Sequence, residues 1–157
     1  MNQDVTTFCR DFINNHFMAV GACVSNGEPR AFTFWYIVYD NKMYWKSRTN
    51  SVHSQAFLSQ PVMSVCIYDH GATYPDDKTG VQIIGTVVQV TDRDEMVNVV
   101  EQFADKFGEK VHQKNNIDDL CDKNTSSTFY SFTPQQIKLV SKELDIHFEE
   151  YKDFTLL

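Results

Sequence analysis

Residues 42–54, KMYWKSRTNSVHS, bring hydroxyl and basic side chains together within a few positions. Such groups bind small anions, because hydroxyls donate hydrogen bonds and cations supply charge. Asn50 and Ser51 also favour the N-cap of a helix, whose first free N–H groups and positive dipole end attract phosphate. The pattern is compatible with a phosphate site, but spacing alone favours a helix N-cap followed by a solvated charged turn, because polar residues are common at helix starts. The residues concerned are Lys46, Ser47, Arg48, Ser51 and His53.

An aromatic segment precedes this candidate site. Residues 30–39, RAFTFWYIVY, are rich in β-branched and aromatic residues, which predicts a strand. The chain then returns directly into residues 42–47, so Phe34, Trp35 and Tyr36 would stand beside the phosphate site. A flat aromatic wall next to a phosphate site suits a nucleotide-like cofactor. Ordinary core packing explains each aromatic residue equally well when it is taken singly.

Short strands and short helices would position these residues. Asn26-Gly27 and Asp40-Asn41 predict tight turns between consecutive strands. Gly85 within a strand predicts a bulge or a close backbone approach. We expect helices at residues 5–14, 51–59, 95–107 and 117–121, and strands at residues 17–24, 30–39, 42–47, 62–68, 81–90, 127–141 and 146–154, with a break at Thr133-Pro134.

Strands joined by tight turns predict an antiparallel sheet. So many short strands, with helices at the connections, favour a mainly β fold in which a barrel carries peripheral helices. The 157 residues suffice for one domain, so residues 1–157 are expected to form a single domain. Apolar residues make up 42% and charged residues 22%, which is typical of globular proteins and excludes disorder.

The charge and the N-terminus exclude several classes of function. The formal charge of −7 disfavours nucleic acid and anionic membranes as partners, because both are polyanions. Residues 1–12 lack the pattern of a signal peptide, and no apolar run approaches the length of a membrane span. The cysteines have no zinc-binding spacing, so no metal site is expected. A reducing cytoplasm is the expected location.

The succession of these motifs resembles the pyridoxamine 5′-phosphate oxidase-like FMN-binding split barrels. That family has NG-x-P before an aromatic or apolar strand, a strand ending in Thr or Ser, Ser-x-Lys at a helix start, and a later strand with V-x-V-x-G. The resemblance covers roughly residues 17–92. Its positions in this chain are Asn26, Gly27, Pro29, Ser47, Ser51, His53, Gln60-Pro61 and Gly85.

The resemblance implies an antiparallel split barrel of Greek-key type and a flavin site. The strand Phe32–Tyr36 would line the isoalloxazine, largely through backbone groups. Lys46 and Ser47 would reach the ribityl phosphate, and the helix start would hold the phosphate itself. The cofactor-binding residues that it implies are Phe32, Thr33, Phe34, Trp35, Tyr36, Lys46, Ser47, Ser51 and His53.

The resemblance also implies an oxidoreductase that passes reducing equivalents from a nicotinamide donor, through FMN, to a small acceptor. Members form homodimers with the flavin at the subunit interface, and the aromatic segments TFYSF (128–132) and HFEEYKDF (147–154) are candidates for that contact. The flavin would carry the redox chemistry, so no catalytic side chain is predicted.

Departures from the family pattern leave alternatives open. Val52 stands where the oxidase has arginine, and His53 stands where it has the phosphate-binding lysine. The chain looks more similar to a subgroup of uncharacterised split-barrel proteins that has histidine at the lysine position. The basic substrate motif has no counterpart in residues 141–154, so pyridoxamine phosphate is not the expected substrate. One alternative is a carrier or sensor that binds flavin or haem without turnover; His147 would then be a possible haem ligand. The other alternative is a deazaflavin-dependent reductase.

Overall fold

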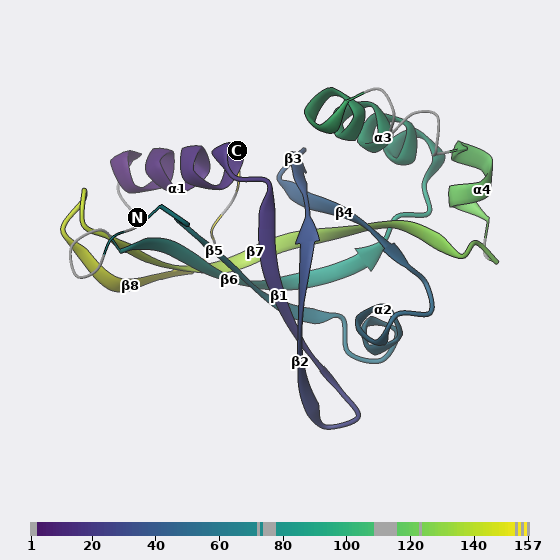
Figure 1. The fold of residues 1–157 in the computed structure, drawn as a ribbon, viewed down its shortest axis with the longest axis horizontal. Helices are drawn as coiled ribbons and strands as arrows, with labels where there is room; N and C mark the ends of the chain where they lie inside the picture. Colours follow the sequence, from purple (N-terminus) through teal and green to yellow (C-terminus); the bar gives the residue numbers. More distant parts are fainter. Residues whose placement is uncertain are drawn as a thin grey trace.

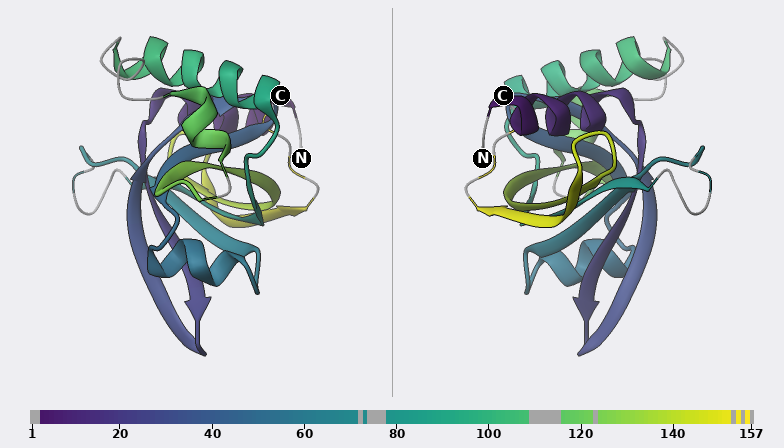
Figure 2. Two further views of the ribbon diagram at one scale, coloured as in Figure 1. Left: turned by 90° about the vertical axis from the view of Figure 1, so that its right-hand side faces the viewer. Right: turned by 90° about the vertical axis from the view of Figure 1, so that its left-hand side faces the viewer.

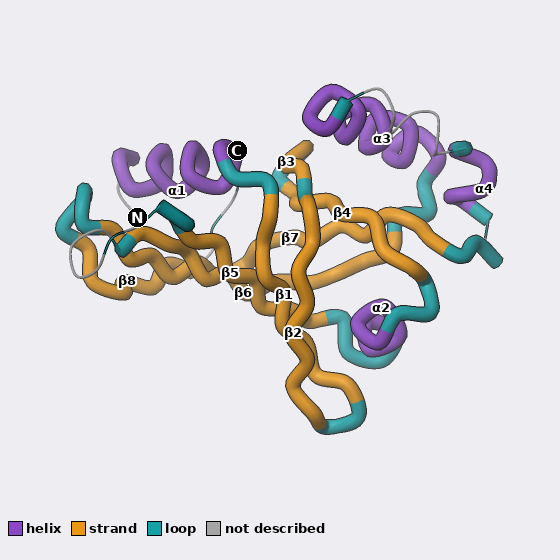
Figure 3. The backbone as a smooth tube through the Cα atoms, in the orientation of Figure 1, coloured by secondary structure: helices purple, strands orange, loops and turns teal. Residues whose placement is uncertain are grey.

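The computed structural model describes residues 3–71, 73, 78–108, 116–122, 124–152, 154 and 156. Helices separate groups of consecutive strands along the chain (Figures 1 and 3). In chain order they are α1 (Gln3–Asn15), β1 (Met18–Ser25), β2 (Glu28–Trp35), β3 (Ile37–Tyr39), β4 (Lys42–Arg48), α2 (Val52–Phe57), β5 (Val62–Tyr68), β6 (Thr79–Gln89), α3 (Arg93–Phe107), α4 (Ile117–Cys121), β7 (Ser127–Ser141) and β8 (Ile146–Lys152).

The strands form one sheet in the order β2-β1-β5-β6-β7-β4-β3, and β8 pairs with β7. Each of these neighbouring pairs is antiparallel. Because β3 follows β2 after one residue, the chain itself connects the two ends of the strand order, and the sheet curls round (Figure 2). In the view of Figure 1, α1, α3 and α4 lie in the upper part of the molecule and α2 lies in the lower part. The predicted class, an antiparallel β-barrel with peripheral helices, is confirmed.

Two tight turns set the register around the barrel opening. Ser25 pairs with Glu28 and Tyr39 pairs with Lys42, so each hairpin has a two-residue loop. The loop residues have positive φ: 53° and 78° at Asn26 and Gly27, and 44° and 62° at Asp40 and Asn41. Asn, Asp and Gly tolerate this conformation, which explains the turns predicted from the sequence.

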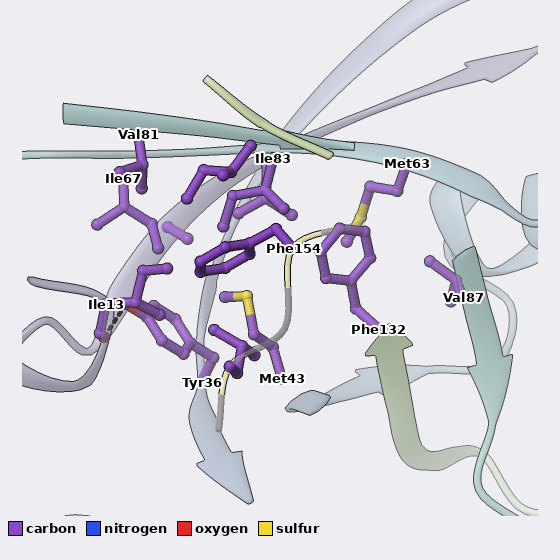
Figure 4. Packing of buried hydrophobic residues seen from close by; sticks show 14 of the residues in the cluster. Ile13, Tyr36, Met43, Met63, Ile67, Val81, Ile83, Val87, Phe132 and Phe154 are labelled. Carbon is purple, nitrogen blue, oxygen red and sulfur yellow. Dashed lines mark hydrogen bonds between the residues drawn. The ribbon is translucent and has the colours of Figure 1, made fainter. Parts of the chain in front are cut away.

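The strand predicted over residues 30–39 is divided at Tyr36. The Tyr36 side chain is fully buried, and its hydroxyl donates to the Ile13 carbonyl oxygen at 2.7 Å (Figure 4). Its backbone N–H donates to the Phe17 carbonyl oxygen at 3.0 Å. These two bonds fix the chain to the end of α1 and just beyond it, so the direction changes there and β3 pairs with β4 instead of continuing β2.

The bulge predicted at Gly85 is present, but the break predicted at Thr133-Pro134 is wrong. β7 runs through both residues, and the β6–β7 register shifts between Ile84 and Gly85, where Gly85 pairs with Pro134. Pro134 has no N–H to donate, so a bulge absorbs the missing ladder bond. A Cβ on Gly85 would lie 2.1 Å from the Thr133 carbonyl oxygen, so only glycine fits without rearrangement.

Buried apolar side chains form two separate clusters. The first, the barrel core, fills the barrel and extends to α1 and α2; Ile13, Tyr36, Met63, Phe132 and Phe154 belong to it (Figure 4). The second, the helix core, lies between α3, α4 and strands β3, β4 and β7. Its buried members are Ile37, Tyr44, Val90, Met96, Val99, Val100, Phe103, Leu120 and Phe129.

Candidate functional site

A cavity of about 380 Å³ lies between β2 and β4. These strands stand near opposite ends of the strand order and do not pair, so the sheet is open there. Within the described residues β2 pairs only with β1, which leaves one backbone edge of β2 without a strand neighbour. The cavity is lined by Met18, Phe32, Thr33, Phe34, Trp35, Trp45, Lys46, Ser47, His53 and Phe103.

Strand alternation places the lining residues of β2 and β4 at two depths. Phe34 and Trp45 are buried, at 7% and 1% exposure, and they belong to the barrel core. Thr33 and Trp35 point outward from β2, and Trp35 is 58% exposed. The cavity therefore has an aromatic floor and an open outer rim.

A cluster of hydroxyl groups and one imidazole forms one end of the cavity. His53 Nε2 lies 2.7 Å from Ser47 Oγ and 3.0 Å from Ser51 Oγ. Ser51 is the N-cap of α2, with an extended backbone (φ −68°, ψ 153°), and its Oγ accepts from the Ser54 N–H. The Ser51 hydroxyl donates to Ser54 Oγ at 2.8 Å. We call Ser47, Ser51, His53 and Ser54 the serine–histidine cluster.

His53 is held by stacking as well as by hydrogen bonds. Its ring lies parallel to Phe32, with centroids 3.9 Å apart and an interplanar angle of 9°. Burial lowers the pKa of His53, so the imidazole is neutral at pH 7 and can both donate and accept. Burial also lowers the pKa of Lys46, which lines the same cavity. The serine–histidine cluster thus offers rotatable donors, and Lys46 stands beside it as the lysine of the described lining.

The opposite end of the cavity is aromatic and is completed by α3. Phe103 of α3 lines the cavity. Trp35 stacks on Phe107, with centroids 5.5 Å apart and an interplanar angle of 19°. Lys106 donates to the carbonyl oxygens of Asn14 and His16, which ties α3 to the end of α1. This end can accept a flat apolar group.

The structure brings most of the predicted site residues together. Tyr36 is the exception: it points into the barrel core and does not line the cavity, because its hydroxyl is bound at Ile13. Ser51 lies behind the lining, in contact with Ser47 and His53. The other predicted residues, Phe32, Thr33, Phe34, Trp35, Lys46, Ser47 and His53, all line the cavity.

Sequence reasoning missed three lining residues. Trp45 shares a face of β4 with Ser47, and this alternation could have identified it. Met18 pairs with Trp35 across the β1–β2 ladder, and Phe103 comes from α3. The contributions of Met18 and Phe103 depend on tertiary packing, so no local pattern indicates them.

A flat ligand with a polar edge and an anionic tail fits this cavity. The free edge of β2 can bond the polar edge, the aromatic floor can cover the flat face, and the serine–histidine cluster can hold the tail. Trp45 contributes to the floor of the cavity, but its Nε1 is buried, has no hydrogen-bond partner among the described residues and is not accessible to a ligand. No carboxylate lines the cavity within the described part of the chain.

The other described histidines lie away from this cavity. His147, a possible haem ligand in the sequence, is 83% exposed and lies 3.8 Å from an Asp145 oxygen. His16 bonds the Phe12 carbonyl oxygen, and His70 packs on Tyr68. In the described ranges no three His, Cys, Asp or Glu side chains gather in a way that could hold a metal ion. None of the described helices is both long and apolar enough to span a bilayer.

The sequence matches the family model of pyridoxamine 5′-phosphate oxidase over residues 5–141. No curated protein matches the sequence closely enough to count as a relative.

Several solved structures have a similar fold at low sequence identity. A conserved hypothetical protein from Mycobacterium tuberculosis is 18% identical, with a TM-score of 0.73 over 95% of this chain and 91% of its own. A haem-binding protein from Mycobacterium smegmatis is 13% identical, with a TM-score of 0.76 over 98% of this chain and 60% of its own. A FAD-binding protein from Mesorhizobium loti is 17% identical, with a TM-score of 0.58 over 83% of this chain and 88% of its own.

Proposed function

Because the chain belongs to the pyridoxamine 5′-phosphate oxidase family, we propose that it binds FMN in the cavity between β2 and β4 and works as an oxidoreductase. The electron donor would be a reduced nicotinamide nucleotide, and the acceptor a small molecule. The serine–histidine cluster at one end of an aromatic cavity is the observation that carries this proposal. It offers donors to a phosphate beside walls that suit a flat ring.

Each part of the cavity would hold a different part of the cofactor. Ser47, Ser51 and His53 would bind the phosphate, with Lys46 supplying charge. The rings of Phe32 and Phe34 would support the isoalloxazine, and the free backbone edge of β2 at Thr33 and Trp35 would bond its polar edge. Tyr36 would act indirectly, because it fixes the end of β2 and does not line the cavity.

Bound flavin supplies reversible hydride and electron transfer, which no side chain in this cavity provides. The chain's own residues bind and orient. The buried floor of Phe34 and Trp45 excludes water from beneath the ring. The exposed Trp35 and the neighbouring Phe103 of α3 leave the outer side open for a second flat substrate.

We further propose that two copies of the chain associate through the outer face of β1, β5 and β6. These strands contain no charged residue, although the chain carries a formal charge of −7. Their outer face exposes Val24, Val62, Ile84 and Val88 at 42%, 45%, 45% and 61%. An uncharged apolar face on an acidic protein is typical of an interface.

Purification without added cofactor tests the proposal directly. We expect the protein to copurify with flavin, or to gain the visible flavin absorbance band when FMN is added, and the mass of the extracted chromophore should be that of FMN. Rapid mixing with NADH or NADPH under anaerobic conditions should then bleach the band. Protein that stays colourless after incubation with FMN would refute flavin binding.

A carrier or sensor without turnover is the second candidate. His53 is neutral where the family has lysine, and Val52, where it has arginine, is 54% exposed and offers no side-chain donor. A weaker hold on the phosphate lowers cofactor occupancy. A flavin band that neither nicotinamide bleaches would favour this candidate. A deazaflavin in the extract would indicate the reductase alternative. A haem Soret band would indicate a haem protein, for which His53 is the imidazole in the described cavity lining.

A further inference from the structure

His53 is the member of the serine–histidine cluster whose charge can change near neutral pH. Its Nε2 lies 2.7 Å from Ser47 Oγ and 3.0 Å from Ser51 Oγ. A serine hydroxyl can donate to an unprotonated ring nitrogen or accept from a protonated one. The cluster can therefore hold the imidazole in its neutral form and in its charged form without moving it.

Aromatic packing fixes the imidazole at the wall of the cavity. The ring stacks on Phe32 with centroids 3.9 Å apart, and the Phe57 centroid lies 6.2 Å away. Phe32 in turn lies against Gly21 of β1, where a Cβ would come within 2.7 Å of the Phe32 ring. Glycine thus leaves the space in which this stack forms. His53 is only partly buried and lines the cavity together with Ser47, so a ligand in the cavity can reach both side chains.

Within the described residues, no carboxylate contacts this imidazole or lines the cavity. Helix α2 has no other charged residue. The charged and titratable groups on the strand segments around it are Cys23, Glu28, Arg30, Lys46, Arg48 and Tyr130. Glu28 is exposed and paired with Arg30, and burial raises the pKa of the Cys23 thiol, which therefore stays neutral. The empty site thus offers an imidazolium no counter-charge, in agreement with the lowered pKa of His53.

We propose that this cavity binds an anionic ligand together with one proton, which His53 takes up on its ring, so that the ligand supplies the counter-charge that the empty site lacks. The inference rests on the proposed flavin site and adds a regulation to it. A lysine would carry a permanent charge at this position, whereas the charge on His53 would exist only in the complex. Because binding favours protonation, protonation must equally favour binding, so the affinity for the phosphate end of FMN rises as the pH falls.

An NMR titration of the histidine ring signals tests this proton directly. The chain has five histidines, and the signal missing from His53→Gln belongs to His53. Without ligand, its titration midpoint should lie below the usual value of about 6.5. FMN should raise the midpoint by about one pH unit or more, whereas riboflavin, which has the same ring system without the phosphate, should not. Inorganic sulfate, which stays dianionic across this pH range, should also raise it.

Calorimetry provides an independent readout. Titration of FMN into the protein at about pH 7.5, in buffers of different ionisation enthalpy, gives the number of protons taken up on binding. Wild-type protein should take up a fraction of a proton that His53→Gln and His53→Lys do not. The phosphate of FMN itself titrates near pH 6, but this contribution is common to all three proteins. From about pH 8 to about pH 6.5, wild-type affinity for FMN should rise about fivefold more than that of His53→Lys.

The outcomes separate this inference from the proposed function. If wild-type protein binds FMN with no more proton uptake than His53→Gln, the inference fails and flavin binding stands. If neither flavin binds but sulfate raises the midpoint of His53, the proton-linked anion site stands and the flavin proposal fails. A midpoint that responds to neither FMN nor sulfate overturns the inference. Should His53→Gln fail to fold, His53→Lys supplies the assignment and the wild-type titration decides.

Discussion

At the residue scale, the serine–histidine cluster would bind an anion without a fixed charge at its own centre. His53 is neutral because burial lowers its pKa, and its Nε2 lies within 3.0 Å of two serine hydroxyls. Hydroxyl and imidazole groups can reverse their donor and acceptor roles, so the cluster stays satisfied when the site is empty and can present donors to an anion. Such a cluster avoids the cost of burying an unpaired cation.

We expect Ser47→Ala and His53→Ala each to weaken FMN binding by about 1–2 kcal/mol, the range of a hydrogen bond to a charged group. Fluorescence titration with FMN measures the loss, and riboflavin should bind both variants nearly as well as it binds the wild type. Ser59→Ala is the matched control, because the Ser59 hydroxyl bonds only the Ala56 carbonyl oxygen among the described contacts. Unchanged FMN affinity in both variants would place the phosphate elsewhere.

His53 also predicts a pH dependence of stability. Its pKa in the folded protein lies below the usual value of about 6.5 because it is buried. As the pH falls through about 6.5, the unfolded chain takes up a proton that the folded chain does not, so the free energy of unfolding decreases. The decrease stops once the pH is below the lowered pKa.

Urea unfolding of ligand-free protein in phosphate-free buffer, between about pH 7.5 and about pH 5.5, measures this effect. His53→Gln cannot titrate, so it should lose less stability over the same range than the wild type. Equal losses in the two proteins would show that other groups cause the dependence.

At the element scale, the sequence predicted the strands and turns more reliably than their bends. Positive-φ turns and alternating strands are local properties, so both hairpins and the bulge at Gly85 could be predicted. The bend at Tyr36 depends on acceptors at Ile13 and Phe17, which belong to other segments. For the same reason Tyr36 was expected at the flavin and instead fixes the end of β2.

Helix α3 also makes tertiary contacts that its local sequence does not predict. Asp92 caps it, with its Oδ1 accepting from the Glu95 N–H at 2.8 Å. The Glu95 side chain, however, accepts from the Tyr44 hydroxyl at 2.7 Å and from Lys42 at 2.8 Å. It thus links α3 to β4, the strand that carries Trp45 and Ser47. Burial and Glu95 both raise the pKa of Tyr44, so its hydroxyl remains a donor.

Glu95→Ala should therefore lower the free energy of unfolding by about 1–3 kcal/mol, because it leaves the fully buried Tyr44 hydroxyl without its acceptor. Chemical denaturation followed by circular dichroism provides the measurement. Arg93→Ala is the control in the same helix turn. Its ion pair with Asp118 is solvent-exposed, so its removal should leave the stability nearly unchanged. Similar effects of the two changes would argue against the Glu95 link.

At the scale of the whole molecule, burial revises one expectation about the partner subunit. The segment TFYSF was expected to contact a second copy, but Phe129 and Phe132 are fully buried within this chain and Tyr130 is 4% exposed. Strand β7 is central in the sheet, between β6 and β4, and it supplies both cores. The uncharged outer face of β1, β5 and β6 is the better candidate for self-association.

Ile84→Lys should convert a dimer into a monomer, because it places a charge without a partner in the middle of that face. Sedimentation velocity measures the change over a range of protein concentrations. Gln102→Lys adds the same charge on the exposed surface of α3 and should leave the mass unchanged. If wild-type protein is already a monomer at all concentrations, the proposed interface is wrong.

The cavity lies between the barrel core and the helix core. This position affects how a large ligand would enter it. Its floor belongs to the barrel core through Phe34 and Trp45, whereas Phe103 belongs to the helix core. Proteins open in cooperative units, and the unit with fewer buried contacts opens at lower cost. Transient detachment of α3 and α4 would uncover the aromatic end while the barrel remains intact. Such detachment would let a large aromatic ligand enter and leave without unfolding of the barrel.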